Sequence, residues 1–416
     1  MGRIDGKVVF VPFVLPGEEV ACTIVRERPR WCEAELLEIL NPSPIRRDPF
    51  CSHFRRCGGC HFQHIPYEYQ LRLKEELFSS ILSRHAGIDV SRVDSIIPSP
   101  GETSWRARAR LAPCPRAPGA TQSWGFYQGR SHDVMGISSC PMLKPSLGEV
   151  LGGLNEIACQ LPDSSFLFKK CIIETGVNDT KRAVLYPDAK GKKDIKKIRK
   201  TYKQADFSVI LCQKRSVFHS LNSRSEICFY KGPLAPEGIF SPPGSFFQAN
   251  LSQNERLVAL VIDFCKRAGA ENILEFFSGS GNFSIPLVSE GFNVTAVESD
   301  GQAVKSARMN LEGNQAPGQG RLHVVQSAAE GFMKEGLKAS SFDAAVLDPP
   351  RSGAAEICRM LARGPLKNVV YVSCDPMTLA RDIAILASGG FGLSRATPVD
   401  MFPNTYHMES VSLLRR

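Results

Sequence analysis

The residues best suited to chemistry lie in Tyr371–Asp382, which reads Y-V-S-C-D-P-M-T-L-A-R-D. An apolar run, Asn368–Tyr371, precedes Cys374, and a helical pattern follows Pro376. We therefore expect a strand that delivers Cys374 at its carboxyl edge, which is where open α/β sheets bind ligands. A thiol there is a candidate nucleophile if its surroundings hold its pKa down. A buried structural thiol is the alternative interpretation.

A second group of residues indicates a cofactor. Glycines between a strand and its helix let the backbone approach a ligand, and Ser278–Asn282 reads S-G-S-G-N after the apolar run Asn272–Phe277. Glu298, 19 positions after Gly279, ends the next predicted strand and could reach ribose hydroxyls. Because the full dinucleotide fingerprint is absent, this pattern favours S-adenosylmethionine, which has no phosphates; a plain strand-to-helix turn is the alternative.

Two further segments extend this site. Asp348-Pro349-Pro350-Arg351 follows a predicted strand, which would put a carboxylate beside the cofactor's methyl group; a plain turn after the strand is the alternative. Upstream, Phe246, Phe247, Gln248 and Asn250 follow the turn Pro242-Pro243-Gly244. We expect Phe247 in the core, Gln248 at the edge of a ligand, and Asn250 either there or capping a helix.

The candidate base is Glu409, in His407-Met408-Glu409-Ser410-Val411, 35 positions after Cys374. Neighbouring strands would bring the two together beside the methyl donor. A thiolate that adds to carbon 6 of a pyrimidine makes carbon 5 nucleophilic toward the methyl group, and a base then removes the carbon-5 proton so that the thiol can leave. Acids before terminal strands are common, so Glu409 alone is a weak signal.

A third group of residues resembles a metal site. Cys51, Cys57 and Cys60 are spaced C-x5-C-x2-C around Gly58-Gly59, and Cys140 is the candidate fourth ligand, with Cys114 as the alternative because proline follows both. Four thiolates hold zinc or a 4Fe–4S cluster, and the lack of a second C-x2-C knuckle favours the cluster. Three buried thiols without a metal are the alternative. His53, His61 and His64 are expected to be surface or structural residues.

The composition sets the broad class. A chain of 416 residues with 43% hydrophobic and 22% charged residues is expected to form two or three globular domains. No stretch approaches the ~18 apolar residues of a spanning helix, and no secretory leader is evident. Fourteen cysteines then indicate a reducing, cytoplasmic setting, and nothing indicates an obligate protein partner.

Basic residues point to RNA. The net charge of +9 permits a polyanionic partner. Lys190–Lys203 is rich in lysine, although a solvated face is the more common meaning of such a run. Arg106, Arg108 and Arg110 alternate beside Trp105, so a strand over Trp105–Leu111 would place them on one face, where phosphates and an unstacked base would fit. The polar face of a half-buried strand is the alternative.

The pattern of elements gives three domains. Short strand-like runs at Lys7–Val14, Val20–Val25 and Glu33–Leu40 suit a small N-terminal β-barrel over residues 1–41, although a set of strands that only packs on its neighbour is the more common meaning of such runs. Residues 42–237 form a predicted α+β central domain with a helix over Tyr67–His85. Residues 238–416 alternate strands and helices, which predicts an α/β, doubly wound, mostly parallel sheet of the Rossmann-like kind.

Taken together, these motifs resemble the RNA uracil-5-methyltransferases, and most closely the iron–sulfur branch that methylates uridine in 23S ribosomal RNA. The similarity covers essentially the whole chain. It rests on seven segments in the family's order: the cysteines with Cys140, S-F-F-Q-A-N, E-F-F-S-G-S-G-N-F, Glu298, D-P-P-R, Y-V-S-C-D-P-M-T-L-A-R-D and H-M-E-S-V.

The resemblance implies a role for each motif. Cys374 would be the nucleophile and Glu409 the base, acting on a uracil flipped out of its stack. S-adenosylmethionine would be bound by Gln248, Phe277, Glu298 and Asp348, with Gly279 and Asn282 nearby. Cys51, Cys57, Cys60 and Cys140 would hold a structural 4Fe–4S cluster, and the N-terminal barrel would be a TRAM domain. The RNA would be ribosomal, with transfer RNA as the alternative.

The chain departs from the family pattern at three places. The barrel begins late, as if its first strand were missing. Asp375 stands where asparagine is usual, which adds a negative charge beside the nucleophile, and Ser278 stands where cysteine is common. Two other functions remain open: a cytosine-5 RNA methyltransferase, which would show another cysteine near Asp348–Arg351, and an iron–sulfur RNA-binding factor without catalysis, against which Cys374 and Glu409 both argue.

Overall fold

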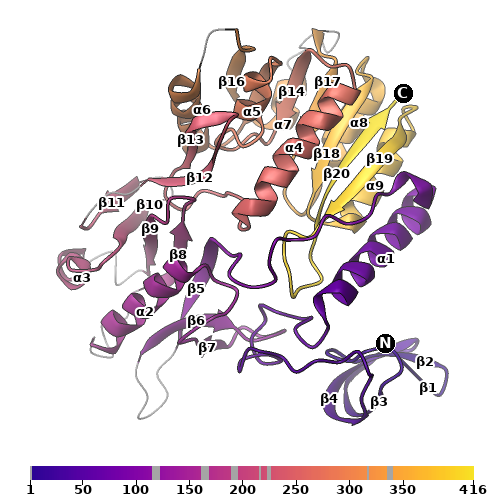
Figure 1. The fold of residues 1–416 in the computed structure, drawn as a ribbon, viewed down its shortest axis with the longest axis vertical. Coiled ribbons are helices and arrows are strands. Elements are labelled where there is room, and N and C mark those ends of the chain that lie inside the picture. Colours follow the sequence, from indigo (N-terminus) through magenta and orange to yellow (C-terminus); the bar gives the residue numbers. More distant parts are fainter. Residues whose placement is uncertain are drawn as a thin grey trace.

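The computed structural model contains three larger β-sheets, a two-stranded sheet of β12 Ile227–Gly232 and β13 Ala235–Ser241, and their helices (Figure 1). It describes residues 2–114, 122–160, 168–188, 195–214, 217–222, 226–315, 318–334 and 341–416. The N-terminal sheet, the central sheet and the C-terminal sheet follow one another along the chain, in the order that the sequence predicts.

The N-terminal sheet has the order β1-β2-β4-β3, so β1 and β3 lie at its edges. Its strands are β1 Gly2–Ile4, β2 Lys7–Phe10, β3 Glu19–Glu27 and β4 Trp31–Asn41. A small core of Val9, Cys32 and Ala34 holds it together. The Glu18 carboxylate accepts hydrogen bonds from Arg46, which ties this sheet to the connector that follows it.

The central sheet has seven strands in the order β11-β10-β9-β8-β5-β6-β7. Helices α2 and α3 contribute Leu147, Leu151 and Ile198 to the core on one face of this sheet. The elements are β5 Arg108–Cys114, β6 Ser123–Tyr127, β7 Val134–Gly136, α2 Pro145–Cys159, β8 Phe168–Thr175, β9 Lys181–Pro187, α3 Ile195–Tyr202, β10 Ser208–Lys214 and β11 Val217–Ser220. Of the basic stretch 190–203, the first five residues lie outside the described ranges.

The C-terminal sheet has the order β16-β15-β14-β17-β18-β20-β19. All its neighbouring strands are parallel except for β20, which runs antiparallel to β18 and β19. The elements are α4 Leu251–Arg267, β14 Asn272–Phe276, α5 Ser284–Ser289, β15 Asn293–Glu298, α6 Gly301–Asn314, β16 Leu322–Gln326, α7 Ala329–Lys334, β17 Ala344–Leu347, α8 Ala355–Arg363, β18 Asn368–Ser373, α9 Pro376–Ala387, β19 Gly392–Val399 and β20 Glu409–Arg415. The predicted doubly wound, mostly parallel sheet is confirmed.

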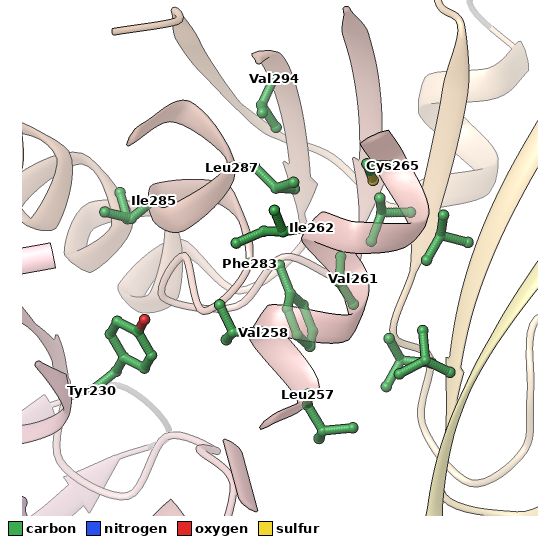
Figure 2. Packing of buried hydrophobic residues seen from close by; sticks show 14 of the residues in the cluster. Tyr230, Leu257, Val258, Val261, Ile262, Cys265, Phe283, Ile285, Leu287 and Val294 are labelled. Carbon is green, nitrogen blue, oxygen red and sulfur yellow. The ribbon is translucent and has the colours of Figure 1, made fainter. Parts of the chain in front are cut away.

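Both faces of this sheet are covered because alternate residues of its buried strands point to opposite sides. Val258, Val261 and Ile262 of α4 pack with Phe283 and Leu287 on one face (Figure 2). On the other face, α8 and α9 pack against strand residues such as Leu274, Val369 and Tyr371. Helix α4 was not among the predicted elements.

Two segments inside the range predicted for the central domain also contribute to these cores. Helix α1, Tyr67–Ala86, lies beside α9 and buries Phe78 and Leu82 in the second face's core (Figure 1). The short 3-10 helix η1, Val90–Arg92, follows it. The hairpin of β12 Ile227–Gly232 and β13 Ala235–Ser241 buries Phe229 and Ile239 in the first face's core. Among the described residues, no helix combines the length and apolar character that a membrane crossing requires.

Candidate active site and cysteine loop

Cys374 and Glu409 lie opposite each other at the edge of the C-terminal sheet. Strand β18 ends at Ser373, which pairs with Ser410 of the antiparallel strand β20. Continuing that register by one residue places Cys374 across from Glu409, the first residue of β20. The structure therefore brings the predicted nucleophile and the predicted base together, across 35 positions of sequence.

Asp348 completes this edge because it follows β17, the other neighbour of β18. The loop after it is fixed from behind by Asp382 of α9: the Ala354 amide donates to Asp382 Oδ2 at 2.7 Å, and the Tyr371 hydroxyl donates to the same oxygen at 2.6 Å. Arg381 donates to the Ser352 carbonyl at 2.8 Å. Arg351, to which the sequence assigned no role, is exposed on this loop.

The surroundings of Cys374 disfavour its thiolate form. Burial first, and then the charges of Glu409 and Asp348, raise the pKa of the Cys374 thiol to about 12, while Arg351 acts to lower it. The condition for a nucleophilic thiol, a pKa held down by its surroundings, is therefore not met in the protein without bound ligands. The physical reason is that partial burial and two nearby carboxyl groups both disfavour the negatively charged thiolate.

Burial raises the pKa of three carboxyl groups at or near this edge. Burial raises the pKa of Asp348 to about 7, and that of Glu409 well above its usual value. The third, Glu275 of β14, was quoted within a motif but given no role. Burial, assisted by Asp348 and Glu298, raises its pKa to about 8, although the hydrogen bond from Ser284 opposes this. The apolar residues on both sides of Glu275, in the run Asn272–Phe277, were the sequence signal that this side chain would be buried.

The glycine loop after β14 is held against Glu298. The Gly279 amide donates to Glu298 Oε2 at 3.0 Å, and the Asp300 amide donates to Oε1 at 2.8 Å. Phe277 takes a φ of 64°, in the left-handed region that a bulky residue avoids. Such strain at a predicted cofactor loop is consistent with a backbone shaped for binding.

The side-chain amides of Gln248 and Asn282, both predicted to contact the cofactor, differ in their hydrogen bonding. Gln248 is 4% exposed, and its Oε1 has no hydrogen-bond partner among the described residues, so it is available to a ligand. The Asn282 amide is paired reciprocally with that of Asn254, at 2.7 and 2.9 Å. Phe247 is buried and stacks on Phe229, as expected of a core residue, and Asn250 caps α4 by accepting from the Gln253 amide.

Asp375 has a structural role. Its carboxylate accepts hydrogen bonds from the Met377 and Thr378 amides, at 2.9 and 3.0 Å, and so caps the N-terminus of α9. The negative charge that seemed to oppose thiolate formation is thus directed at a helix N-terminus, which stabilises it.

The four predicted ligand cysteines line one cavity of about 1530 Å³. Its other walls come from the N-terminal sheet, from Arg106 and Arg110, and from Tyr406 and His407 just before Glu409. The thiols are close enough to influence one another: Cys51 and Cys140 both act to raise the pKa of Cys57, although burial is the larger cause. Cys114 instead contacts the Val134 carbonyl at 3.4 Å.

The arrangement of these thiols does not by itself form a metal centre. No group of three or more His, Cys, Asp or Glu side chains in the described ranges is arranged to hold a metal ion. His64 packs against the rings of Phe13 and Phe54, which is a structural role as expected. His61 packs against the rings of Tyr406 and His407, with centroids 4.6 and 6.3 Å away.

The alternating arginines have separate roles. Arg108 is bound to Glu174 and to the Gly244 carbonyl, both at 3.1 Å, so it holds the protein together. Arg106 lies over the Trp105 ring at 4.9 Å and acts to lower the pKa of Cys57, Cys60 and Cys140. Only Arg110 is exposed, and β5 begins at Arg108 rather than at Trp105.

Comparison with known proteins relates this chain to one group of enzymes. Residues 240–416 match the family model described as tRNA (Uracil-5-)-methyltransferase, and residues 1–37 match the TRAM domain. The chain is 32% identical to the 23S rRNA (uracil(1939)-C(5))-methyltransferase RlmD of Pectobacterium atrosepticum, over 99% of this chain and 90% of that protein. It is 31% identical to the RlmD of Shewanella sediminis, over 99% and 92%.

A solved structure is similar over nearly the whole chain. It is the tRNA (uracil-54, C5)-methyltransferase of Pyrococcus abyssi in complex with S-adenosyl-L-homocysteine, at a TM-score of 0.74 and 26% identity, covering 98% of this chain and 94% of that one. The similarity therefore extends over the N-terminal, central and C-terminal sheets.

Proposed function

The chain belongs to the RNA uracil-5-methyltransferase family, and we propose that it transfers a methyl group from S-adenosylmethionine to carbon 5 of a specific uridine in RNA. The observation that carries this proposal is the register of β18 and β20, which puts Cys374 opposite Glu409, with Asp348 directly after the adjacent strand β17. Ribosomal RNA is the favoured substrate, because the relatives named for 23S rRNA are 31–32% identical and the one named for tRNA is 26% identical.

In the proposed reaction, the Cys374 thiol gives up its proton and the sulfur adds to carbon 6 of the uracil. The electron pair of the carbon 5–carbon 6 double bond moves into an enolate. Carbon 5 then takes the methyl group, and the sulfonium of the donor leaves as a neutral thioether. Glu409 removes the carbon-5 proton, and the electrons of that bond restore the double bond and expel the thiolate.

The buried carboxyl groups suit this order of events. Glu409 must be ionised to act as a base, yet burial favours its neutral form in the unliganded protein. If Cys374 passed its proton to Glu409, the thiolate would form but Glu409 would be protonated and could not act as a base. The thiol proton must therefore leave the site before Glu409 removes the carbon-5 proton. Arg351 favours the charged forms of both groups.

For the methyl donor, we propose that Glu298 binds the ribose hydroxyls and that Gln248, Phe277 and Asp348 contact the rest of the molecule, with Gly279 and Asn282 lining the same loop. The unpartnered Gln248 Oε1 supports its role. Asn282 is held by Asn254, so it would act mainly by shaping the loop.

We also propose that Cys51, Cys57, Cys60 and Cys140 hold a 4Fe–4S cluster. Four thiolates are the ligand set that such a cluster uses, and all four line the same cavity. Their present arrangement is not that of a formed metal site, so the proposal rests on the donor chemistry. Protein purified without oxygen should be brown and should contain about four iron and about four sulfide ions per chain, as one 4Fe–4S cluster would supply. A colourless, zinc-loaded protein would contradict the proposal.

The function itself is tested by mapping 5-methyluridine in the RNA of the host with and without this protein. We expect one uridine of 23S rRNA to lose its methyl group when the protein is removed and to regain it on complementation. An unchanged map would overturn the proposal, and a lost 5-methylcytidine would favour the cytosine-5 alternative. Such an enzyme would work in the cytoplasm, where ribosomal RNA is assembled.

A further inference from the structure

The segment that leads into Glu409 is tied down from outside its own sheet. Residues 400–408 connect β19 to β20. At their start, the buried Lys74 of α1 forms a 2.5 Å ion pair with the buried Asp400 and also donates to the Phe402 carbonyl at 3.0 Å. The Tyr67 hydroxyl donates to the second Asp400 oxygen at 2.8 Å. The route of this segment is therefore decided partly by α1.

Asn404 is the centre of a second set of contacts. It is fully buried, and its φ of 64° places it in the left-handed region, which asparagine tolerates better than most residues. The side-chain nitrogen Nδ2 of Asn404 donates to the backbone carbonyl of Glu102 at 2.7 Å. Its Oδ1 accepts from Gln70 at 3.1 Å and from Arg47 at 3.3 Å.

The backbone of Asn404 is equally engaged. Its amide donates to Gln70 Oε1 at 2.8 Å. Its carbonyl accepts from the amides of His61 and Phe62, at 2.8 and 3.0 Å. His61 and Phe62 directly follow Cys60, so this carbonyl is where the cysteine loop is attached to the segment before Glu409.

A second contact joins the same two parts of the chain. The His61 ring packs on the Tyr406 ring at 4.6 Å, and Tyr406 packs on His407 at 4.2 Å. The His407 amide donates to Thr405 Oγ1 at 3.1 Å, and that hydroxyl donates to the Phe402 carbonyl at 2.8 Å. These contacts fix the backbone between Asn404 and His407, so the position of His407, two residues before Glu409, depends on that of Asn404.

We propose that Asn404 is a positioning residue: it joins the cysteine loop to the segment before Glu409, and so sets where the Glu409 carboxyl group lies relative to Cys374. The proposal rests on the proposed role of Glu409 as the base. Strand pairing to Val399 and Ser373 holds the backbone of β20, but not the side-chain packing at its first residue. The cysteine loop would then support catalysis through this connection, although Phe62 precedes Cys374 by 312 positions in the sequence.

The test compares Asn404→Gly with Asn404→Asp and with Asn314→Ala. Glycine keeps the left-handed backbone and removes every side-chain bond of Asn404, whereas aspartate keeps the acceptor and loses the bond to Glu102. Asn314 is the matched control: it is also buried and bonded to Gly238, Asn310 and Glu237, but between β13 and α6.

In single-turnover reactions, we expect Asn404→Gly to slow resolution of the covalent protein–RNA adduct about 10-fold, so that the adduct accumulates on a denaturing gel. The KM for S-adenosylmethionine should stay within about 2-fold of the native value. The rate of adduct resolution in Asn404→Asp should lie between the rates in Asn404→Gly and in the native protein. Asn314→Ala should lower the melting temperature without accumulating adduct.

Hydrogen exchange gives a readout that does not need activity. In Asn404→Gly, amides of His61 and Phe62 and of residues 405–409 should exchange faster together. Native protection at His61 and Phe62, or a loss of activity that only follows the folded fraction with no change in adduct, overturns the proposal. If the native protein forms no adduct and methylates no RNA, the proposed function fails instead, and the exchange data still decide whether Asn404 makes the connection.

Discussion

Two thiol-bearing regions of this molecule are built in opposite ways. At the sheet edge, Cys374 directly follows one strand and Glu409 begins its neighbour, so regular backbone pairing sets the backbone positions of both residues. In the cysteine loop, Cys51, Cys57 and Cys60 lie in irregular backbone, and single hydrogen bonds such as that from the Cys51 amide to Gln63 Oε1 place the chain. Regular pairing gives the first region its geometry without help from a ligand, whereas the second needs its contacts, and we propose its cluster, to take a final shape.

The strongest test of this difference is Cys374→Ala. We expect methyl transfer to RNA to fall by at least about 10³-fold, because no other group at the edge can add to carbon 6. Binding of S-adenosylmethionine, measured by calorimetry, should be unchanged because strand pairing, not the thiol, shapes the edge. Cys159→Ala, which alters an exposed thiol at the end of α2, is the control and should transfer normally. Retained transfer in Cys374→Ala would exclude the covalent mechanism.

Glu409→Gln should act later in the same reaction. Loss of a general base costs about 10²- to 10⁴-fold in rate, and here the methylated intermediate cannot eliminate without it. We expect a covalent protein–RNA adduct that survives a denaturing gel and that is absent in the double variant with Cys374→Ala. Normal turnover without adduct would mean that another group removes the proton.

In the cysteine loop, the comparison is between Cys140→Ser and Cys114→Ser. Cys140 lines the cavity with the other three thiols, whereas Cys114 contacts Val134 on β7. We expect Cys140→Ser to lose most bound iron, measured together with the visible absorption of the purified protein, and Cys114→Ser to keep it. The reverse result would reassign the fourth ligand. In both variants, alkylation of Cys374 should be unchanged if the edge forms independently.

How far the sequence predicts these regions follows from the same difference. Alternating strands and helices predicted the C-terminal sheet, and its strand ends predicted where Cys374 and Asp348 lie. The contacts around Asn404 were out of reach, because Asn404 and Arg47 are 357 positions apart. Similarly, nothing near Tyr67–Ala86 indicates that Lys74 meets Asp400 on another element. Local patterns define elements, but contacts between distant loops depend on the completed fold.

The pH dependence of Cys374 can sharpen the description of the edge. Because burial and two carboxyl groups raise its pKa to about 12, the thiolate is scarce at neutral pH in the unliganded protein. Alkylation of Cys374 by iodoacetamide should be slow at pH 8 and should rise steadily toward pH 11. Arg351→Ala removes a charge that favours the thiolate, so its profile should move to higher pH. Fast alkylation near pH 7 would show that the pKa is not raised.

The smallest expected effect concerns Asp375. Its carboxylate caps α9, and asparagine caps helices about as well as aspartate. Asp375→Asn should therefore leave the melting temperature unchanged and the turnover rate within about 2-fold of the native value, even though it removes a charge next to Cys374. Asp375→Ala should instead cost about 1 kcal/mol of unfolding free energy, measured by urea denaturation. A large rate increase in Asp375→Asn, without a change in stability, would mean that its charge opposes the thiolate despite the helix N-terminus.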